Sequence, residues 1–181
     1  TRLSDGMSGR MAAPLSFVRL RLQMYGFKGV ERRPGLFDET SLERVREKLR
    51  SAELRALVSY WDALRADRPM PARGGIDPID LKRHLPRLIL AEVLYEPLRF
   101  RLRIVGTELE DKLGRRMTGS TLTDETPMFF KPYAACATGV RATREFLSFD
   151  FGGGGPPGTF ERVLLPLSED GETVNGILGE A

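Results

Sequence analysis

Few residues of this chain could carry out chemistry on a bound molecule. His84 is the only histidine and Cys136 the only cysteine among 181 residues. One histidine and one cysteine far apart in the sequence cannot supply the four ligands of a zinc site, so zinc is disfavoured. The single cysteine excludes an internal disulfide and predicts a reducing, cytoplasmic location. The sequence contains no Gly-x-Ser-x-Gly, protein-kinase or His-Glu-x-x-His motif, and we assign no catalytic residue.

Two further patterns could indicate a binding site. The run Gly152–Gly155 could cradle a phosphate if a helix began directly after it, but Pro156-Pro157 and a further strand follow. We therefore expect a flexible hairpin loop. Asp77 and Asp80 lie three residues apart at the start of a short predicted helix. The pair is explained if Asp77 caps the helix and Asp80, in its first turn, interacts favourably with the helix dipole.

Arginines on the predicted strands are the polar groups to consider for ligand binding. The stretch Phe100–Val105 alternates apolar residues with arginines, which is the period-two pattern of a strand with one buried face. Arg103 should therefore point to the outer face. Arg162 shares a face with Phe160 and could enter a pocket. An inward guanidinium would need an anionic partner: a carboxylate ligand, an internal acid such as Glu145, or a salt bridge to another element.

The order of predicted strands and helices around these residues indicates an α+β fold. Strands are predicted at residues 87–94, 99–105, 144–151, 159–167 and 173–179, and a helix opened by Pro127 at residues 127–141. The connections at residues 95–98 and 168–172 are of hairpin length. Five strands with helices inserted after the second predict a five-stranded antiparallel sheet with helices on one face.

Residues 1–39 are predicted to form a basic, flexible, partner-binding extension. Residues 1–33 hold seven basic and two acidic side chains, whereas the remainder has a net charge of −2. Val18, Leu20 and Leu22 alternate with polar residues, which favours a strand that packs on its own domain or on a partner. Peripheral membrane contact through this extension stays an alternative, although its apolar and cationic faces do not separate. A nucleic-acid partner is disfavoured because the net charge of the residues after 33 is close to zero.

A long N-terminal helix is predicted at residues 40–66, opened by the capping box Thr40–Glu43. Its apolar face shifts partway along: Leu42, Val45 and Leu49 lie on one side, and Leu54, Leu57, Val58, Trp61 and Leu64 lie on another. Two interpretations fit this pattern. Either the first half is free to contact another chain, or the helix breaks near Ser51 and both halves pack on the same body.

An ordered set of short motifs runs through the second part of the chain. Its members are Trp61-Asp62, Arg68-Pro69, Ile76-Asp77-Pro78, Leu85-Pro86, Val105-Gly106-Thr107, Thr118-Gly119, Glu161-Arg162, Pro166-Leu167-Ser168 and Ile177-Leu178-Gly179. Over about residues 57–180 this set, with the strand order, resembles the stand-alone bacterial PAS domain family (PAS_5 type). Arg116 departs from the pattern, because the family usually has an acidic residue before Thr-Gly.

The resemblance implies a sensor domain, at residues 67–181, that holds a small ligand or an empty pocket between its sheet and a long helix. The candidate pocket residues are Phe100, Leu102, Ile104, Phe130, Tyr133, Phe146, Phe160, Arg162 and Leu178. The family commonly dimerises through flanking helices, and we expect a homodimer with a protein partner. The candidate contact residues are Leu42, Val45, Leu49, Val18, Leu20 and Leu22.

No cofactor is assigned. A lone imidazole can be an axial haem ligand, but His84 precedes the first predicted strand, away from the pocket helix, and is expected to be a surface or capping residue. Cys136 lies among alanines without the polar surround of the light-sensing, flavin-binding subgroup. A small core residue is the simpler interpretation. Haem and flavin are therefore both disfavoured.

The sequence leaves three functions open. The first is a non-enzymatic sensory or regulatory protein that binds a small ligand or a protein partner and signals in trans. The second is a small α+β enzyme acting on an acyl or hydrophobic substrate, which would need a general acid or base in the pocket. The third is a basic-tail binder of anionic lipid or nucleic acid, which would show steep salt dependence.

Overall fold

The computed structural model describes residues 28–31, 42–150 and 158–181 of the chain. Several sequence predictions lie outside these residues. They concern the contact residues Val18, Leu20 and Leu22, the cap at Thr40, and the glycine run Gly152–Gly155.

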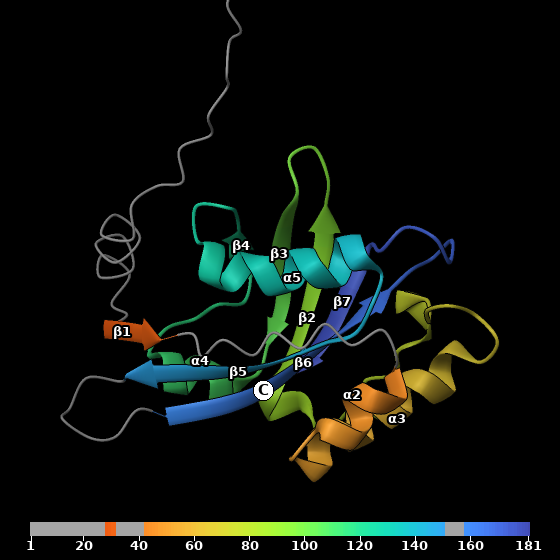
Figure 1. The fold of residues 1–181 in the computed structure, drawn as a ribbon, viewed down its shortest axis with the longest axis horizontal. Helices are drawn as coiled ribbons and strands as arrows, with labels where there is room; N and C mark the ends of the chain where they lie inside the picture. The colour runs from red at the N-terminus through yellow and green to blue at the C-terminus, as the bar shows by residue number, and fades with distance from the viewer. Residues whose placement is uncertain (1–27, 32–41, 151–157) are drawn as a thin grey trace, which may run out of the picture.

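The described residues form an α+β fold that is built on a seven-stranded antiparallel sheet with the strand order β1-β5-β6-β7-β2-β3-β4. The strands are β1 (Lys28–Glu31), β2 (Leu88–Leu94), β3 (Arg99–Val105), β4 (Thr121–Leu122), β5 (Thr143–Asp150), β6 (Gly158–Leu167) and β7 (Gly176–Glu180). The five predicted strands are confirmed to within a few residues, and β1 and β4 are added at the two edges. The sheet is strongly twisted: β2 and β3 run roughly upright in Figure 1, and β5 and β6 run across.

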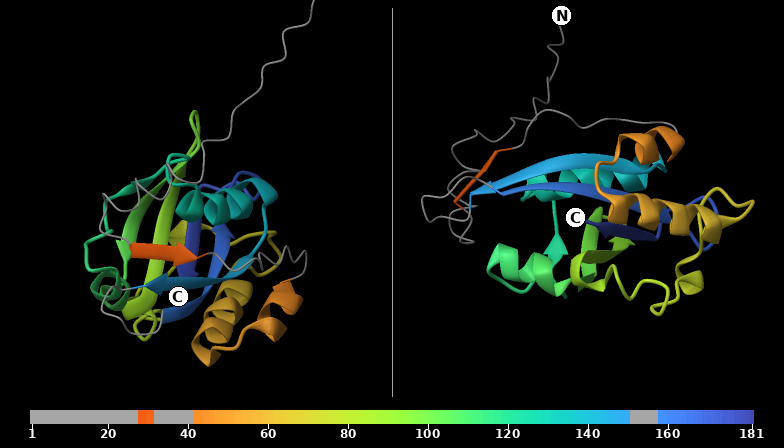
Figure 2. Two further views of the ribbon diagram at one scale, coloured as in Figure 1. Left: turned by 60° about the vertical axis from the view of Figure 1, so that its left-hand side comes forward. Right: turned by 90° about the horizontal axis from the view of Figure 1, so that it is seen from below.

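The helices are α2 (Leu42–Lys48), α3 (Ala52–Arg65), α4 (Thr107–Leu113) and α5 (Pro127–Gly139), with short 3₁₀ turns η1 (Arg73–Gly75) and η2 (Leu85–Arg87). Helix α5 crosses in front of β3, β2 and β7 in Figure 1. Figure 2 shows α2 and α3 lying beside each other at one end of the sheet, away from α4. None of the helices in the described ranges has the length and apolar content needed to cross a membrane.

The predicted helix at residues 40–66 is interrupted at Ser51. Ser51 has an extended backbone (φ −74°, ψ 131°), and its hydroxyl accepts a hydrogen bond from the Leu54 amide at 3.3 Å, which makes it the N-cap of α3. Val45 is fully buried and Leu49 is 2 % exposed, because both pack into the chain's own core. The interpretation in which the first half stands free is therefore corrected: in this fold Val45 and Leu49 are not available to a partner. Leu42 is half-buried against the same core.

A β-bulge changes the face of one candidate pocket residue. Leu90 pairs with Ile104 and Ala91 pairs with Leu102, so Arg103 is an extra residue in β3. Beyond the bulge the alternation is reversed. Ile104 is 40 % exposed, whereas Val105 is buried. The prediction that Ile104 faces the interior is corrected for this reason.

Candidate functional site

A largely apolar cavity of about 60 Å³ lies between the sheet, α4 and α5. Its walls are formed by Ile89, Leu102, Val105, Leu109, Lys112, Leu113, Met117, Leu122, Phe129, Tyr133, Leu147, Phe160, Arg162 and Ala181. One buried water needs roughly 10–15 Å³ on a comparable measure, so the cavity has room for several waters or one small molecule. It is partly open to solvent at the side of α4, where Lys112 is exposed.

Strand pairing decides which residues of β5 and β6 reach this cavity. Leu147 pairs with Phe160, and Glu145 pairs with Arg162, so these four side chains share one face of the sheet. Phe146 pairs with Glu161 and faces the opposite side. There its ring lies 4.5 Å from the Arg144 guanidinium carbon. The prediction that Phe146 lines the pocket is corrected, and Leu147 takes its place.

Of the nine candidate pocket residues, the structure brings four together around the cavity: Leu102, Tyr133, Phe160 and Arg162. Phe100 lies behind the wall, with its ring centroid 5.4 Å from those of both Phe130 and Tyr133. Leu178 is fully buried but pairs with Leu90 and Leu165, on the sheet face turned away from the cavity.

Some cavity residues that were not predicted from the sequence have a recognisable spacing along their helices. Leu109 and Leu113 lie four residues apart on α4, and Phe129 and Tyr133 lie four residues apart on α5. Side chains with this spacing share one helix face. The four-residue spacing from Tyr133 could therefore have identified Phe129, and not Phe130, as a cavity residue. Val105 gave no such signal, because the bulge in β3 moves it to the interior.

Arg162 is the charged group deepest in the cavity wall, and its charge is compensated from within the chain. It is 5 % exposed, its Nε donates to Glu145 Oε1 at 2.7 Å, and its Nη2 donates to the same oxygen. Burial is the largest single effect and disfavours the guanidinium, but the charge and hydrogen bond of Glu145, together with Tyr133, raise the pKa of Arg162 above its ordinary value. Of the arrangements considered for Arg162, the structure has the inward guanidinium with Glu145 as its partner.

Tyr133 contributes a hydroxyl to the cavity wall. The residue is 2 % exposed, and the Arg162 guanidinium carbon lies 5.2 Å from its ring centroid. Burial raises the pKa of Tyr133 above its ordinary value, against the opposing effect of the nearby Arg162 charge. Within the described part of the chain the hydroxyl has no hydrogen-bond partner. A tyrosine hydroxyl can donate one hydrogen bond and accept others, so this group has capacity for a water or a ligand.

The remaining reactive groups do not form a catalytic site with the cavity. Among the described residues no aspartate, glutamate, histidine or cysteine side chain lines it, and no cluster of three or more potential metal ligands occurs. Cys136 is fully buried, and burial raises its pKa, which keeps the thiol protonated.

His84 is buried, contrary to the expectation of a surface or capping residue. It is 2 % exposed, and its Nδ1 lies 2.7 Å from Oε2 of the fully buried Glu180. Arg87 contacts the other Glu180 oxygen at 3.3 Å, and Arg83 Nε donates to His84 Nε2 at 3.2 Å. The correction has a simple cause: Glu180 at the end of β7 is the buried partner of both His84 and Arg87, which lie just before β2. Asp77 accepts a hydrogen bond from the Ile79 amide in a turn at the start of the segment before β2.

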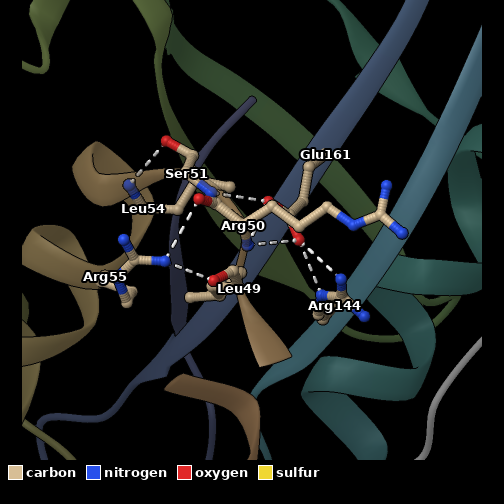
Figure 3. Close-up of polar contacts among 7 residues, drawn as sticks. All are labelled: Leu49, Arg50, Ser51, Leu54, Arg55, Arg144 and Glu161. Atoms are coloured by element: carbon tan, nitrogen blue, oxygen red, sulfur yellow. Dashed lines mark hydrogen bonds and ion pairs between the residues drawn. The ribbon is translucent and has the colours of Figure 1, made fainter. Parts of the chain in front are cut away.

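Glu161 joins the opposite face of the sheet to the junction between α2 and α3 (Figure 3). Its Oε2 accepts hydrogen bonds from the backbone amides of Arg50 at 2.9 Å and Ser51 at 3.0 Å. Its Oε1 lies 2.7 Å from Arg144 Nη2 in an ion pair whose side chains are 6 % and 8 % exposed. Because Glu161 lies between Phe160 and Arg162 in β6, the cavity wall and this junction share one strand.

An antiparallel sheet that is covered by helices, with a small apolar cavity between them, suits the binding of a small ligand. A family model described as PAS domain matches residues 49–181, and the chain belongs to this family. The match begins within the α2–α3 junction and includes all of α3. No curated protein matches the sequence. PAS domains are in general sensory and regulatory domains, and they commonly bind ligands and other proteins.

Proposed function

We propose that this protein is a non-enzymatic PAS sensor that binds a small molecule in the cavity under α4 and α5 and signals through contact with another protein. The observation that carries the proposal is the cavity itself. Its lining is apolar apart from Lys112, Tyr133 and Arg162, which suits reversible binding of a small ligand.

The enzyme alternative receives less support from the same residues. A general acid or base must contact the reacting atoms and titrate near the working pH. Burial raises the pKa of Tyr133, and Arg162 is held as a cation by Glu145. Neither group is suited to exchange a proton near neutral pH. No observation on the described residues favours the basic-tail alternative over the sensor.

We further propose that the protein acts as a homodimer in the cytoplasm. The buried free thiol of Cys136 is consistent with a reducing compartment. Since Val45 and Leu49 are buried, the candidate contact residues that remain are Leu42 and, in the extension, Val18, Leu20 and Leu22. Sedimentation of the full chain against a variant with Val18, Leu20 and Leu22 changed to serine tests this. A monomeric wild-type protein would contradict it.

A cavity-filling variant tests ligand binding. We expect native mass spectra of the full chain, purified from its own host, to show a retained small molecule that Leu102→Phe loses. Ile104→Phe is the matched control, because it adds the same ring on the same strand but on the exposed face. The proposal fails if the wild-type protein retains nothing and if xenon, a general probe of apolar cavities, shifts the amide resonances of wild type and Leu102→Phe alike.

A further inference from the structure

The cavity has an uneven distribution of polar groups. Its apolar part is formed by leucines, Ile89, Val105, Met117 and Phe129, whereas Tyr133, Arg162 and Lys112 occupy one side. We call these three residues the polar wall. Arg162 lies over the Tyr133 ring at 5.2 Å, and Lys112 Nζ lies 4.8 Å from the ring centroid of Phe160, which is two residues from Arg162 in β6. The polar wall therefore extends from the buried end of the cavity to its rim.

The polar wall carries positive charge and a hydrogen-bond donor. Glu145 compensates the charge of Arg162, but Lys112 forms no ion pair within the described part of the chain. Glu108 lies four residues before Lys112 on α4, at the spacing of a helical ion pair. The Lys112 ammonium instead lies over the Phe160 ring at the rim. The cavity lining thus includes one cation without an ion pair and one tyrosine whose hydroxyl has no partner among the described residues.

We propose that the ligand is a small apolar acid: a molecule of about eight non-hydrogen atoms with one carboxylate at the polar wall, a size set by a cavity that holds several waters. The inference rests on the proposed function and deepens it by naming the ligand class. The Tyr133 hydroxyl donates a hydrogen bond to the carboxylate, and the Lys112 ammonium neutralises its charge at the rim. The apolar part of the molecule fills the space among the leucines and Phe129, where burial of each methylene is favourable.

Three probes of equal chain length separate this ligand class from others. Hexanoate, hexanamide and hexylammonium differ in charge at one end and are titrated into the full chain, with amide chemical shifts as the readout. We expect hexanoate to bind roughly tenfold more tightly than hexylammonium, because the uncompensated charge in the cavity is positive. Equal or tighter binding of hexylammonium would overturn the proposal.

Single-group variants then test the polar wall. Tyr133→Phe removes only the hydroxyl and should weaken hexanoate binding roughly tenfold. Its thermal midpoint should stay unchanged or rise, because the hydroxyl has no protein partner to lose. Lys112→Gln should weaken hexanoate binding about fivefold and leave hexanamide binding unchanged. Lys131→Gln, on the exposed side of α5, is the charge-matched control and should bind hexanoate as the wild type does.

The outcomes distinguish the ligand class from the sensor proposal. If both polar-wall variants bind hexanoate as the wild type does, while hexanamide and xenon still bind in the cavity, the acid inference is overturned and the ligand pocket stands. If xenon and all three probes bind nowhere in the cavity, both the acid inference and the ligand pocket fall together.

Discussion

Glu161 shows how one side chain can fix the position of a whole element. Its carboxylate pairs with Arg144 and accepts hydrogen bonds from the first amides of the α2–α3 junction. Amides at a helix start lack partners within the helix, and a carboxylate there also interacts favourably with the helix dipole. We expect Glu161→Gln to lower the free energy of unfolding by about 3 kcal/mol, because it leaves the buried Arg144 cation without its counter-charge. Urea unfolding of the full chain measures this.

The control for Glu161→Gln is Glu172→Gln, an exposed position at which the same change should cost little. Adding Arg144→Met to Glu161→Gln should recover part of the lost stability, because it removes the unpaired buried cation. A double variant less stable than Glu161→Gln alone would contradict the assigned role of the ion pair.

Asp170 organises the turn between β6 and β7 and should make stability depend on pH. It accepts hydrogen bonds from the amides of Glu172 at 2.8 Å and Thr173 at 2.7 Å and from the Ser168 hydroxyl at 2.8 Å. These bonds hold the pKa of Asp170 well below its ordinary value of 3.8. A carboxyl group with a depressed native pKa stabilises the fold above its unfolded pKa, and that stabilisation is lost as the pH falls through the native pKa.

Asp170→Asn should therefore lower the thermal midpoint near neutral pH, and the difference from wild type should shrink as the pH falls below about 4. Thermal unfolding between pH 7 and pH 2 measures this difference. Asp67→Asn is the matched control, because Asp67 is exposed and no shift in midpoint is expected there. A difference that grew toward acid pH would be inconsistent with the depressed pKa.

At the scale of elements, Gly106 allows α4 to begin directly against η2. A Cβ at this position would lie 2.2 Å from the Pro86 carbonyl oxygen and 2.5 Å from the Arg87 amide nitrogen. Both atoms belong to the backbone and cannot rotate away. Gly106→Ala should therefore cost about 3 kcal/mol or more in unfolding free energy and displace α4 from the cavity. Gly74→Ala, where a Cβ meets nothing within 4 Å, should leave the urea midpoint nearly unchanged.

The elements that the sequence predicted well are those whose pattern is local. Alternation and hairpin spacing located five strands, and Pro127 located the start of α5. The errors arise where a distant contact changes a local pattern. The bulge at Arg103 depends on pairing with β2, and the break at Ser51 is stabilised by Glu161, 110 residues away. His84 looked like a surface residue because its partner Glu180 lies 96 residues later in the sequence.

In the whole molecule, the sheet separates the cavity, which α4 and α5 cover, from the face that carries α2 and α3. Consecutive residues of β5 and β6 form two ion pairs on opposite faces of the sheet: Arg162 with Glu145 toward the cavity, and Glu161 with Arg144 toward the α2–α3 junction. Because neighbouring residues of a strand share one backbone, we expect a change in the position of one pair to alter the position of the other. The arrangement therefore predicts that an occupant of the cavity affects the α2–α3 junction on the far face.

This connection predicts a local response at the α2–α3 junction when hexanoate binds. Any ligand slows the amide exchange that occurs through global unfolding, and it does so equally for all such amides. An additional effect through β6 should appear at the Arg50 and Ser51 amides, which bond directly to Glu161, and should exceed the change at Val58 within α3. Hydrogen exchange followed by NMR, with and without hexanoate, measures both.

Two variants decide whether β6 carries this response. In Glu161→Gln the extra protection at Arg50 and Ser51 should disappear while hexanoate still binds, because the link to the junction is weakened but the cavity is intact. In Leu102→Phe the filled cavity should abolish binding and the response together. Equal changes at Arg50, Ser51 and Val58 in the wild type would mean that hexanoate only stabilises the whole fold, and the proposed connection across the sheet would then be wrong.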